Sequence, residues 1–205
     1  MKKLFSLFLG GLLFSCFNLN AQDKAGKFTA REIGIYSSVG VNNIFTFQLL
    51  DGAAGYRNDG FIALGGNYIQ NINRLLDFEI AVEYSKHNVL VSPSYIPFGD
   101  MAEERREFKI LSFPVMARIN VGKYFYLNGG LLFSFDMSKE KMIDNQTGIG
   151  GILGLGVKYN FDRNISVFIN PYSKVYPLIP FLPDNYHQRV WENGIRIGLM
   201  YNLGK

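Results

Sequence analysis

The sequence predicts an all-β protein, an eight-stranded antiparallel up-and-down transmembrane β-barrel. Three observations predict it. Apolar and polar residues alternate along eight segments, as they do in strands with one face in an apolar medium. The links between these segments are alternately short and long, as in membrane barrels. Aromatic residues (15%) and 22 glycines favour strands and turns, and a mean hydropathy of +0.05 is too polar for a bundle of membrane helices.

The N-terminal segment is expected to be a secretory signal. Lys2 and Lys3 precede an apolar run over 4–17, and residues 18–21 lead to an expected cleavage after Ala21. A retained membrane helix is the alternative, but the run is too short to span comfortably. We therefore predict a signal peptide over 1–21, a short lead-in over 22–29 and a barrel domain over 30–205.

Composition excludes several classes of site and partner. The single cysteine, Cys16, lies inside the expected signal, so cleavage leaves no disulfide and no cysteine ligand for a metal. The signal also carries two lysines and no acid, which leaves 19 basic and 17 acidic residues, a formal charge of +2. Such a balance argues against a nucleic-acid partner, which needs a clustered basic face.

The alternation is clearest in 76–84, where Leu76, Phe78 and Ile80 share one face and Asp77 and Glu79 the other. By this criterion the expected strands are 30–40, 60–70, 75–87, 107–121, 124–136, 148–160, 164–173 and 190–203.

Three of the links between the expected strands are short, at 71–74, 122–123 and 161–163. The other links are long, at 41–59, 88–106, 137–147 and 174–189. Transmembrane barrels have tight periplasmic turns and long outer loops. A soluble β-sandwich or a lipocalin-like periplasmic binding protein is the alternative. Long apolar strips and aromatic residues near the strand ends favour the membrane.

The face opposite the apolar strips is expected to fill the lumen. An eight-stranded barrel is just wide enough inside for side chains to fill it, and charges confined there must be paired or hydrated. We therefore predict an ion-paired structural network rather than an open pore, with a proton or ion path as the alternative. Its charged members are Glu79, Glu83, Arg118, Lys158, Glu192 and Arg196.

No catalytic, cofactor or metal motif stands out. The two histidines, His87 and His187, fall near the outer rim in spacings that match no metal site, and we interpret them as solvated loop residues. Ser85 and His87 would permit a lipid-modifying enzyme but do not indicate one. We expect a non-enzymatic protein without a cofactor.

The last long link is apolar and rich in proline from Val175 to Pro183. Proline removes a ladder donor, so we expect a loop here, and an exposed apolar loop can bind a protein partner. The alternative is that it folds over the barrel mouth or lies in the interfacial belt. The residues expected to form the partner surface are Tyr176, Leu178, Ile179, Phe181 and Leu182.

Two motifs resemble those of the PorT-like outer-membrane β-barrel family. Residues 110–118 resemble its strand motif of apolar residues around one proline, Pro114, closing on a basic residue, Arg118. Residues 125–130 (Phe-Tyr-Leu-Asn-Gly-Gly) are similar to its next strand. The chain departs from the family in Ile119, where an aromatic residue is frequent, and in its non-aromatic C-terminal residue. The resemblance implies an eight-stranded outer-membrane barrel without catalytic residues.

The expected function is that of an integral outer-membrane barrel with a structural, adhesive or assembly-partner role. A component of a protein secretion system and a small channel or hydrophobic-ligand conduit are the alternatives. Expected partners are outer-membrane lipid and a protein at the outer loops. The sequence leaves open whether the protein is a monomer or an oligomer.

Overall fold

The computed structural model describes residues 30–46, 55–92, 104–138, 143–161, 164–182 and 188–203. The expected signal and lead-in, residues 1–29, lie outside these ranges, so both stay predictions. Among the residues described, there is no helix long and apolar enough to cross a membrane.

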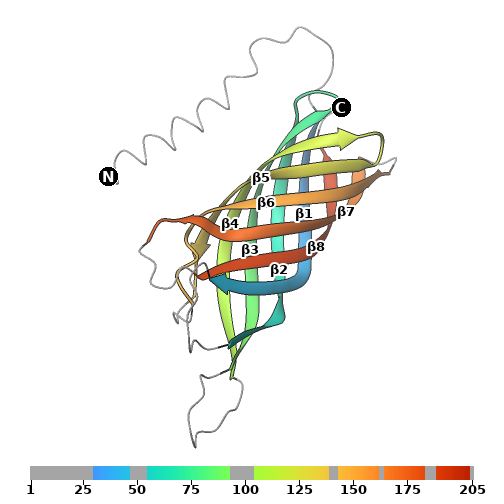
Figure 1. Cartoon of the computed structure of the whole chain (residues 1–205). Helices are drawn as coiled ribbons and strands as arrows, with labels where there is room; N and C mark the ends of the chain where they lie inside the picture. Colours follow the sequence, from blue (N-terminus) through green and yellow to red (C-terminus); the bar gives the residue numbers. More distant parts are fainter. Residues whose placement is uncertain are drawn as a thin grey trace, which may run out of the picture.

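Eight strands form one closed barrel, in which each strand pairs antiparallel with its neighbours in sequence and the first pairs with the last (Figure 1). The predicted fold is therefore confirmed. The strands are β1 (Arg31–Thr46), β2 (Gly55–Asn71), β3 (Leu76–Ser92), β4 (Glu104–Val121), β5 (Phe125–Asp136), β6 (Gly148–Asn160), β7 (Ile165–Pro180) and β8 (Gln188–Asn202).

The barrel has two different ends. Both chain ends of the barrel, Arg31 and Asn202, lie at the end where the links β2–β3, β4–β5 and β6–β7 are short, which we call the short-turn end. The opposite end carries the four longer links, and we call it the long-loop end. At the short-turn end the strands begin and end within two residues of the prediction.

At the long-loop end several strands run further than predicted. β1 continues to Thr46 instead of ending near residue 40, because its continuation pairs with β8 up to Thr46↔Gln188. β7 continues to Pro180 instead of ending near residue 173. Pro177 is accommodated because the ladder with β6 is irregular between Ile149 and Gly151, so β7 carries extra residues there.

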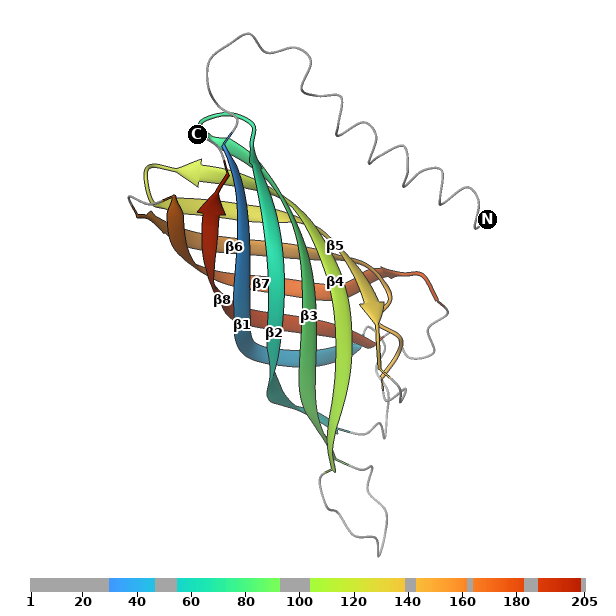
Figure 2. The same ribbon diagram turned by 180° about the vertical axis from the view of Figure 1, so that it is seen from behind.

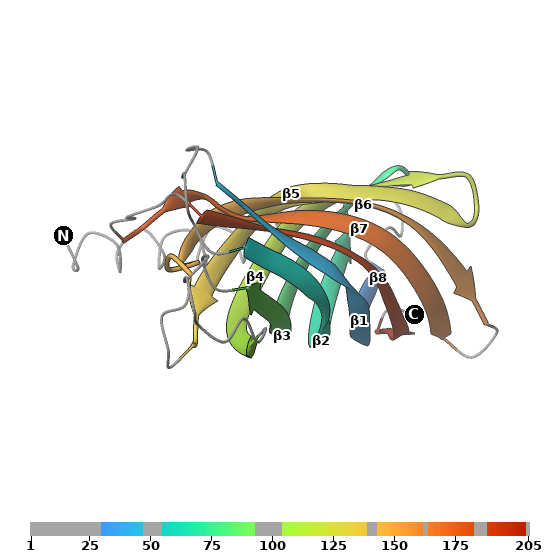
Figure 3. The ribbon, with the colours of Figure 1, turned by 60° about the horizontal axis from the view of Figure 1, so that its bottom comes forward.

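The wall is less continuous between β1 and β2 than elsewhere. Their pairing ends at Gly40↔Phe61, and beyond that point β1 curves to follow β8 alone (Figures 2 and 3). β2 is bulged between Asn58 and Phe61, where Gly60 has a φ of 84°, a conformation that favours glycine. Toward the long-loop end, β1 and β2 therefore diverge.

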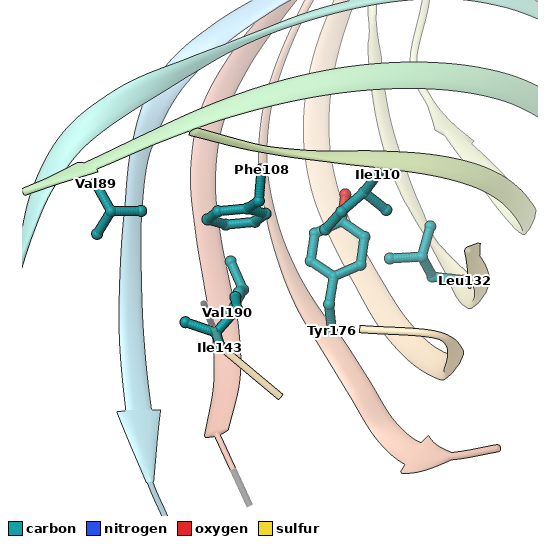
Figure 4. Packing of buried hydrophobic residues seen from close by; sticks show 7 residues of the cluster. All are labelled: Val89, Phe108, Ile110, Leu132, Ile143, Tyr176 and Val190. Carbon is teal, nitrogen blue, oxygen red and sulfur yellow. The ribbon is translucent and has the colours of Figure 1, made fainter. Parts of the chain in front are cut away.

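Polarity is inverted relative to a soluble barrel. Leucine, isoleucine, valine and aromatic side chains point outward on all eight strands; Ile35, Leu64 and Leu153 are each 68% exposed. Charged and polar side chains fill the inside, where Glu83, Arg118, Lys174 and Asn128 are buried. Three apolar clusters also lie inside. The outermost, at the long-loop end, comprises Val89, Phe108, Ile110, Leu132, Ile143, Tyr176 and Val190 (Figure 4).

Candidate functional site

A compact group of buried charges occupies the middle of the lumen. It contains Glu83 of β3, Lys174 of β7, and Glu192 and Arg196 of β8, all of which are at most 1% exposed. Alternation along the three strands points these side chains inward, and the closed barrel brings them together. We call these four residues the central charge cluster.

Each acid of the central charge cluster meets a base. The Nζ of Lys174 contacts one carboxylate oxygen of Glu83 and lies 3.0 Å from Oε1 of Glu192. The Nη2 of Arg196 donates to Oε2 of Glu83 at 3.0 Å. Two negative and two positive charges therefore neutralise one another in a region shielded from water, which is the condition for burying ions at acceptable cost.

Tyrosines complete the central charge cluster. The hydroxyl of Tyr172 donates to Oε1 of Glu192 at 2.6 Å, and that of Tyr176 donates to Oε2 at 3.1 Å. The guanidinium carbon of Arg196 lies 4.2 Å from the ring centroid of Tyr36. Hydrogen bonds and cation–π contacts thus hold both ionic side chains of β8 in place. The arrangement fills the lumen with fixed groups rather than with mobile ones.

His87 lies inside the barrel, which corrects its interpretation as a solvated loop residue. Its ring stacks between Phe61 and Phe108, at centroid distances of 5.3 and 4.7 Å, and is fully buried. The reason is that β3 extends to Ser92, so that position 87 follows the inward alternation of Glu83 and Ser85. His187 lies outside the described residues.

Ser85, His87 and Glu192 come close enough to suggest a catalytic triad, but their geometry does not support one. The Oγ of Ser85 and Oε2 of Glu192 both face Nε2 of His87, at 2.9 and 3.5 Å. A triad needs the acid at the other ring nitrogen, and here the amide of Asn42 lies 3.3 Å from Nδ1. All three side chains are also wholly buried.

The short-turn end of the lumen is polar and hollow. Lys158 donates to both carboxylate oxygens of Glu32 at 2.8 and 2.9 Å. Asp77 accepts one hydrogen bond from Asn71 at 2.6 Å and one from Asn120 at 2.7 Å. These residues line a cavity of about 200 Å³, which we call the mouth cavity.

The predicted lumen residues occupy two levels. Glu83, Glu192 and Arg196 belong to the central charge cluster, whereas Lys158 and Arg118 line the mouth cavity. Glu79 lies between the two levels and accepts a hydrogen bond from the amide of Asn67 at 2.8 Å. The prediction missed Lys174 because it placed residues 174–189 in a loop. Inward alternation of Asn170, Tyr172 and Tyr176 was the signal that could have found it.

The five residues of the predicted partner surface do not lie on one surface, because one is inside the barrel and four are exposed. Tyr176 is an inward, fully buried residue of β7 and is not part of an outer loop, because the strand continues past it. Leu178, Ile179, Phe181 and Leu182 are between 45% and 61% exposed at the long-loop end. Within the described part of the chain, no group of three or more histidine, cysteine, aspartate or glutamate residues could hold a metal ion.

No protein-family model matches the sequence, and a search of curated proteins also returns no match. Two solved structures share the architecture. The outer membrane protein OprG from Pseudomonas aeruginosa aligns over 90% of this chain and all of its own, with a TM-score of 0.56 at 13% identity. The outer membrane protein AlkL, solved in DMPC bilayers, aligns over 92% of this chain and 97% of its own, with a TM-score of 0.55 at 10% identity. The chain therefore has the fold of small eight-stranded outer-membrane β-barrels.

Proposed function

We propose that the protein is an integral outer-membrane barrel that neither conducts nor catalyses, and that acts as a structural, adhesive or assembly partner through its long-loop end. The inverted polarity carries the proposal. Exposed leucine, isoleucine and valine surround the barrel, while charged side chains are buried inside it. A soluble barrel would have to expose that apolar belt to water, whereas lipid accepts it.

Two layers in series support a closed lumen. The central charge cluster fills the middle, and the apolar cluster around Phe108, Leu132 and Val190 fills the long-loop end (Figure 4). An ion that crosses the lumen would have to separate a buried ion pair and then enter an apolar layer, and each step is costly. This favours a non-conducting barrel over the channel alternative.

The exposed side chains of Leu178, Ile179, Phe181 and Leu182 support a role in binding a partner. The resemblance of residues 110–118 and 125–130 to the PorT-like family supports the part of the proposal that makes the protein an outer-membrane barrel. It extends the proposal to membership of that family.

Neighbouring leucines on β5 provide a direct test of the membrane orientation. Leu131 points outward and is 55% exposed, whereas Leu132 is fully buried. In a bilayer, Leu131→Arg should lower the free energy of unfolding by about 2–4 kcal/mol. The matched control is Ile72→Arg, on an exposed turn at the short-turn end, which should change it little.

The measurement is the midpoint of the heat-induced mobility shift on a denaturing gel, with protein folded in lipid vesicles. A lower midpoint for Leu131→Arg alone supports the proposal. Tolerance of arginine at position 131, with the protein in the periplasmic fraction, would contradict it. Planar-bilayer recordings should show no single-channel conductance; steady openings would contradict the closed lumen.

The partner role is tested by replacing Leu178, Ile179, Phe181 and Leu182 with serine. The variant should keep its heat-induced mobility shift but lose a co-purifying protein that the wild type retains. The matched control replaces Ile72 and Leu75, which are exposed at the opposite end. Loss of the partner in both variants, or in neither, would contradict a specific surface.

A further inference from the structure

The mouth cavity contains a buried cation to which the described residues provide neither a hydrogen bond nor an ion pair. Arg118 of β4 lines this cavity and is only 2% exposed. Among the described residues, it makes neither a hydrogen bond nor an ion pair. Arg196 is equally buried but donates to Glu83 at 3.0 Å. The two arginines therefore differ in whether the protein itself supplies an anion.

The two acids that line the cavity, Asp77 and Glu32, are engaged elsewhere. Glu79, also inward on β3, does not line the cavity, although its Oε2 is buried without a hydrogen-bond partner. Asp77 lies directly opposite Arg118 on the β3–β4 ladder, but its two oxygens accept hydrogen bonds from Asn71 and Asn120. Glu32 is held by Lys158. The Arg118 guanidinium instead lies on the ring of Tyr126, with its central carbon 3.4 Å from the ring centroid. That contact fixes its plane but provides no hydrogen-bond acceptor.

One guanidinium nitrogen of Arg118 remains to contact a ligand in the mouth cavity. Its Nε and Nη2 atoms are shielded from solvent and have no hydrogen-bond partner. This leaves Nη1 as the nitrogen that reaches the mouth cavity. An unsatisfied buried guanidinium is costly, and an acceptor with a negative charge is the group that would offset that cost best.

Size and charge of the mouth cavity narrow the choice of ligand. Its volume of about 200 Å³ exceeds that of an engineered cavity known to hold benzene, about 150 Å³. The walls carry Arg74, Arg118, Lys123 and Lys158 against Glu32 and Asp77, so cations are in excess. The two wall carboxylates nevertheless disfavour a ligand with two negative charges.

We propose that the mouth cavity binds a small monovalent carboxylate, with Arg118 as the residue that contacts it. The carboxylate could belong to a free small molecule or to the C-terminus of a peptide, since both present the same group. This inference concerns the short-turn end alone, so its failure would leave the proposed role of the long-loop end unaffected.

The test follows the Nε–H resonance of Arg118 by NMR in protein labelled with ¹⁵N-arginine and folded in detergent micelles. The resonance is assigned by its absence in Arg118→Lys. Sodium acetate should shift it saturably, whereas sodium chloride at equal ionic strength should not. The internal control is Arg196, which does not line the cavity and should not shift. An equal response to chloride, or no response to acetate, would overturn the proposal.

Two variants check the assignment by calorimetric titration with acetate. Loss of a charge-assisted contact in Arg118→Gln should raise the dissociation constant at least about tenfold. Arg105→Gln, at the long-loop end and outside the cavity, is 65% exposed; it is the matched control and should change the dissociation constant by less than about threefold. Equal affinities in the wild type and Arg118→Gln, or tighter binding of phosphate than of acetate, would overturn the proposal.

A short acetylated peptide with a free C-terminus separates the two sources of carboxylate, with the same peptide amidated as its control. Tighter binding of the free peptide than of acetate identifies a chain end as the ligand. Binding no tighter than acetate identifies a small free carboxylate. A response to the amidated peptide equal to that of the free one would contradict recognition of a carboxylate.

Discussion

The two ends of the lumen differ in what fills them. At the long-loop end, Phe108, Leu132 and Val190 pack with Ile143 into an apolar layer. At the short-turn end, Glu32, Asp77 and Lys158 line a polar cavity. Apart from Ile143, which lies in the β5–β6 link, these residues occupy positions on the barrel strands, so the difference depends mainly on the choice of side chain. The lumen is therefore filled by apolar side chains toward the loops, and it is polar and hollow toward the turns.

This difference has an energetic consequence. In the filled part, ionic and apolar side chains are buried and depend on one another for stability. At the mouth, where Lys158 and Glu32 retain some exposure, water can replace a lost partner. Equivalent substitutions should therefore cost most in the middle and at the long-loop end, and least at the short-turn end.

The largest effect is expected from Lys174→Met. It leaves the buried Glu192 carboxylate without its ion-pair partner, which should lower the free energy of unfolding by about 3–5 kcal/mol. Denaturant titration in detergent micelles measures it. The double variant Lys174→Met/Glu192→Gln removes the uncompensated charge and should regain part of the loss. A double variant no more stable than the single one would contradict the pairing.

Leu132→Ala tests the apolar layer and should cost about 2–5 kcal/mol, because a fully buried side chain is replaced by a cavity. Its neighbour Leu131 points outward and supplies the control. Leu131→Ala should cost less, because detergent can occupy the vacated space. The same denaturant titration compares both variants. An equal fall in the free energy of unfolding in the two would mean that the apolar layer is not tightly packed.

Gly122→Ala probes the turn between β4 and β5 at the short-turn end. Gly122 has a φ of 67°, and nothing lies within 4 Å of an added methyl group, so the alanine should destabilise the protein through backbone strain and not through a steric clash. The free energy of unfolding should fall by about 1–2 kcal/mol. Gly66 lies in a strand without positive φ and also has room for a methyl group. Gly66→Ala should be close to neutral, and a similar loss in both would argue against strain.

The smallest effect is expected at the mouth itself. Lys158→Met removes the ion pair with Glu32, whose side chains retain 18% and 12% exposure, and should cost no more than about 1 kcal/mol. Added salt should reduce the difference from the wild type, since the pair is reached by solvent. If Lys158→Met lowered the free energy of unfolding as much as Lys174→Met does, and independently of salt, the proposed difference between the two ends would be contradicted.

Sequence reasoning succeeded where alternation is strict. The pattern in 76–84 and 111–119 predicted the strands and their faces, because one face meets an apolar medium. It failed where prolines and polar residues interrupt the pattern near the long-loop end. Lys174 and Tyr176 were placed in a loop, although they belong to β7. Strand continuation there depends on pairing with distant residues, which the local sequence does not show.

Partners inside the lumen were harder to predict. Alternation placed Arg118 and Arg196 on inward positions, but it could not show that Arg196 donates to Glu83 across the barrel, whereas Arg118 lies on the ring of Tyr126. Those contacts depend on the tilt and closure of the sheet. His87 was misplaced because β3 extends to Ser92, and its stacking on Phe61 and Phe108 of the neighbouring strands could not be predicted from alternation.

The pairing of β1 with β8 determines the order in which the barrel can form. It runs from Glu32↔Asn202 to Thr46↔Gln188 and joins opposite ends of the chain, whereas every other ladder joins consecutive strands. Pairing β1 with β8 first would close a loop of nearly the whole barrel domain, and no other contact would yet offset the lost chain entropy. The hairpins of consecutive strands should therefore form first, and the β1–β8 ladder should form last. Until then, both edges are open to pairing with another chain, so rapid closure also protects the protein from aggregation.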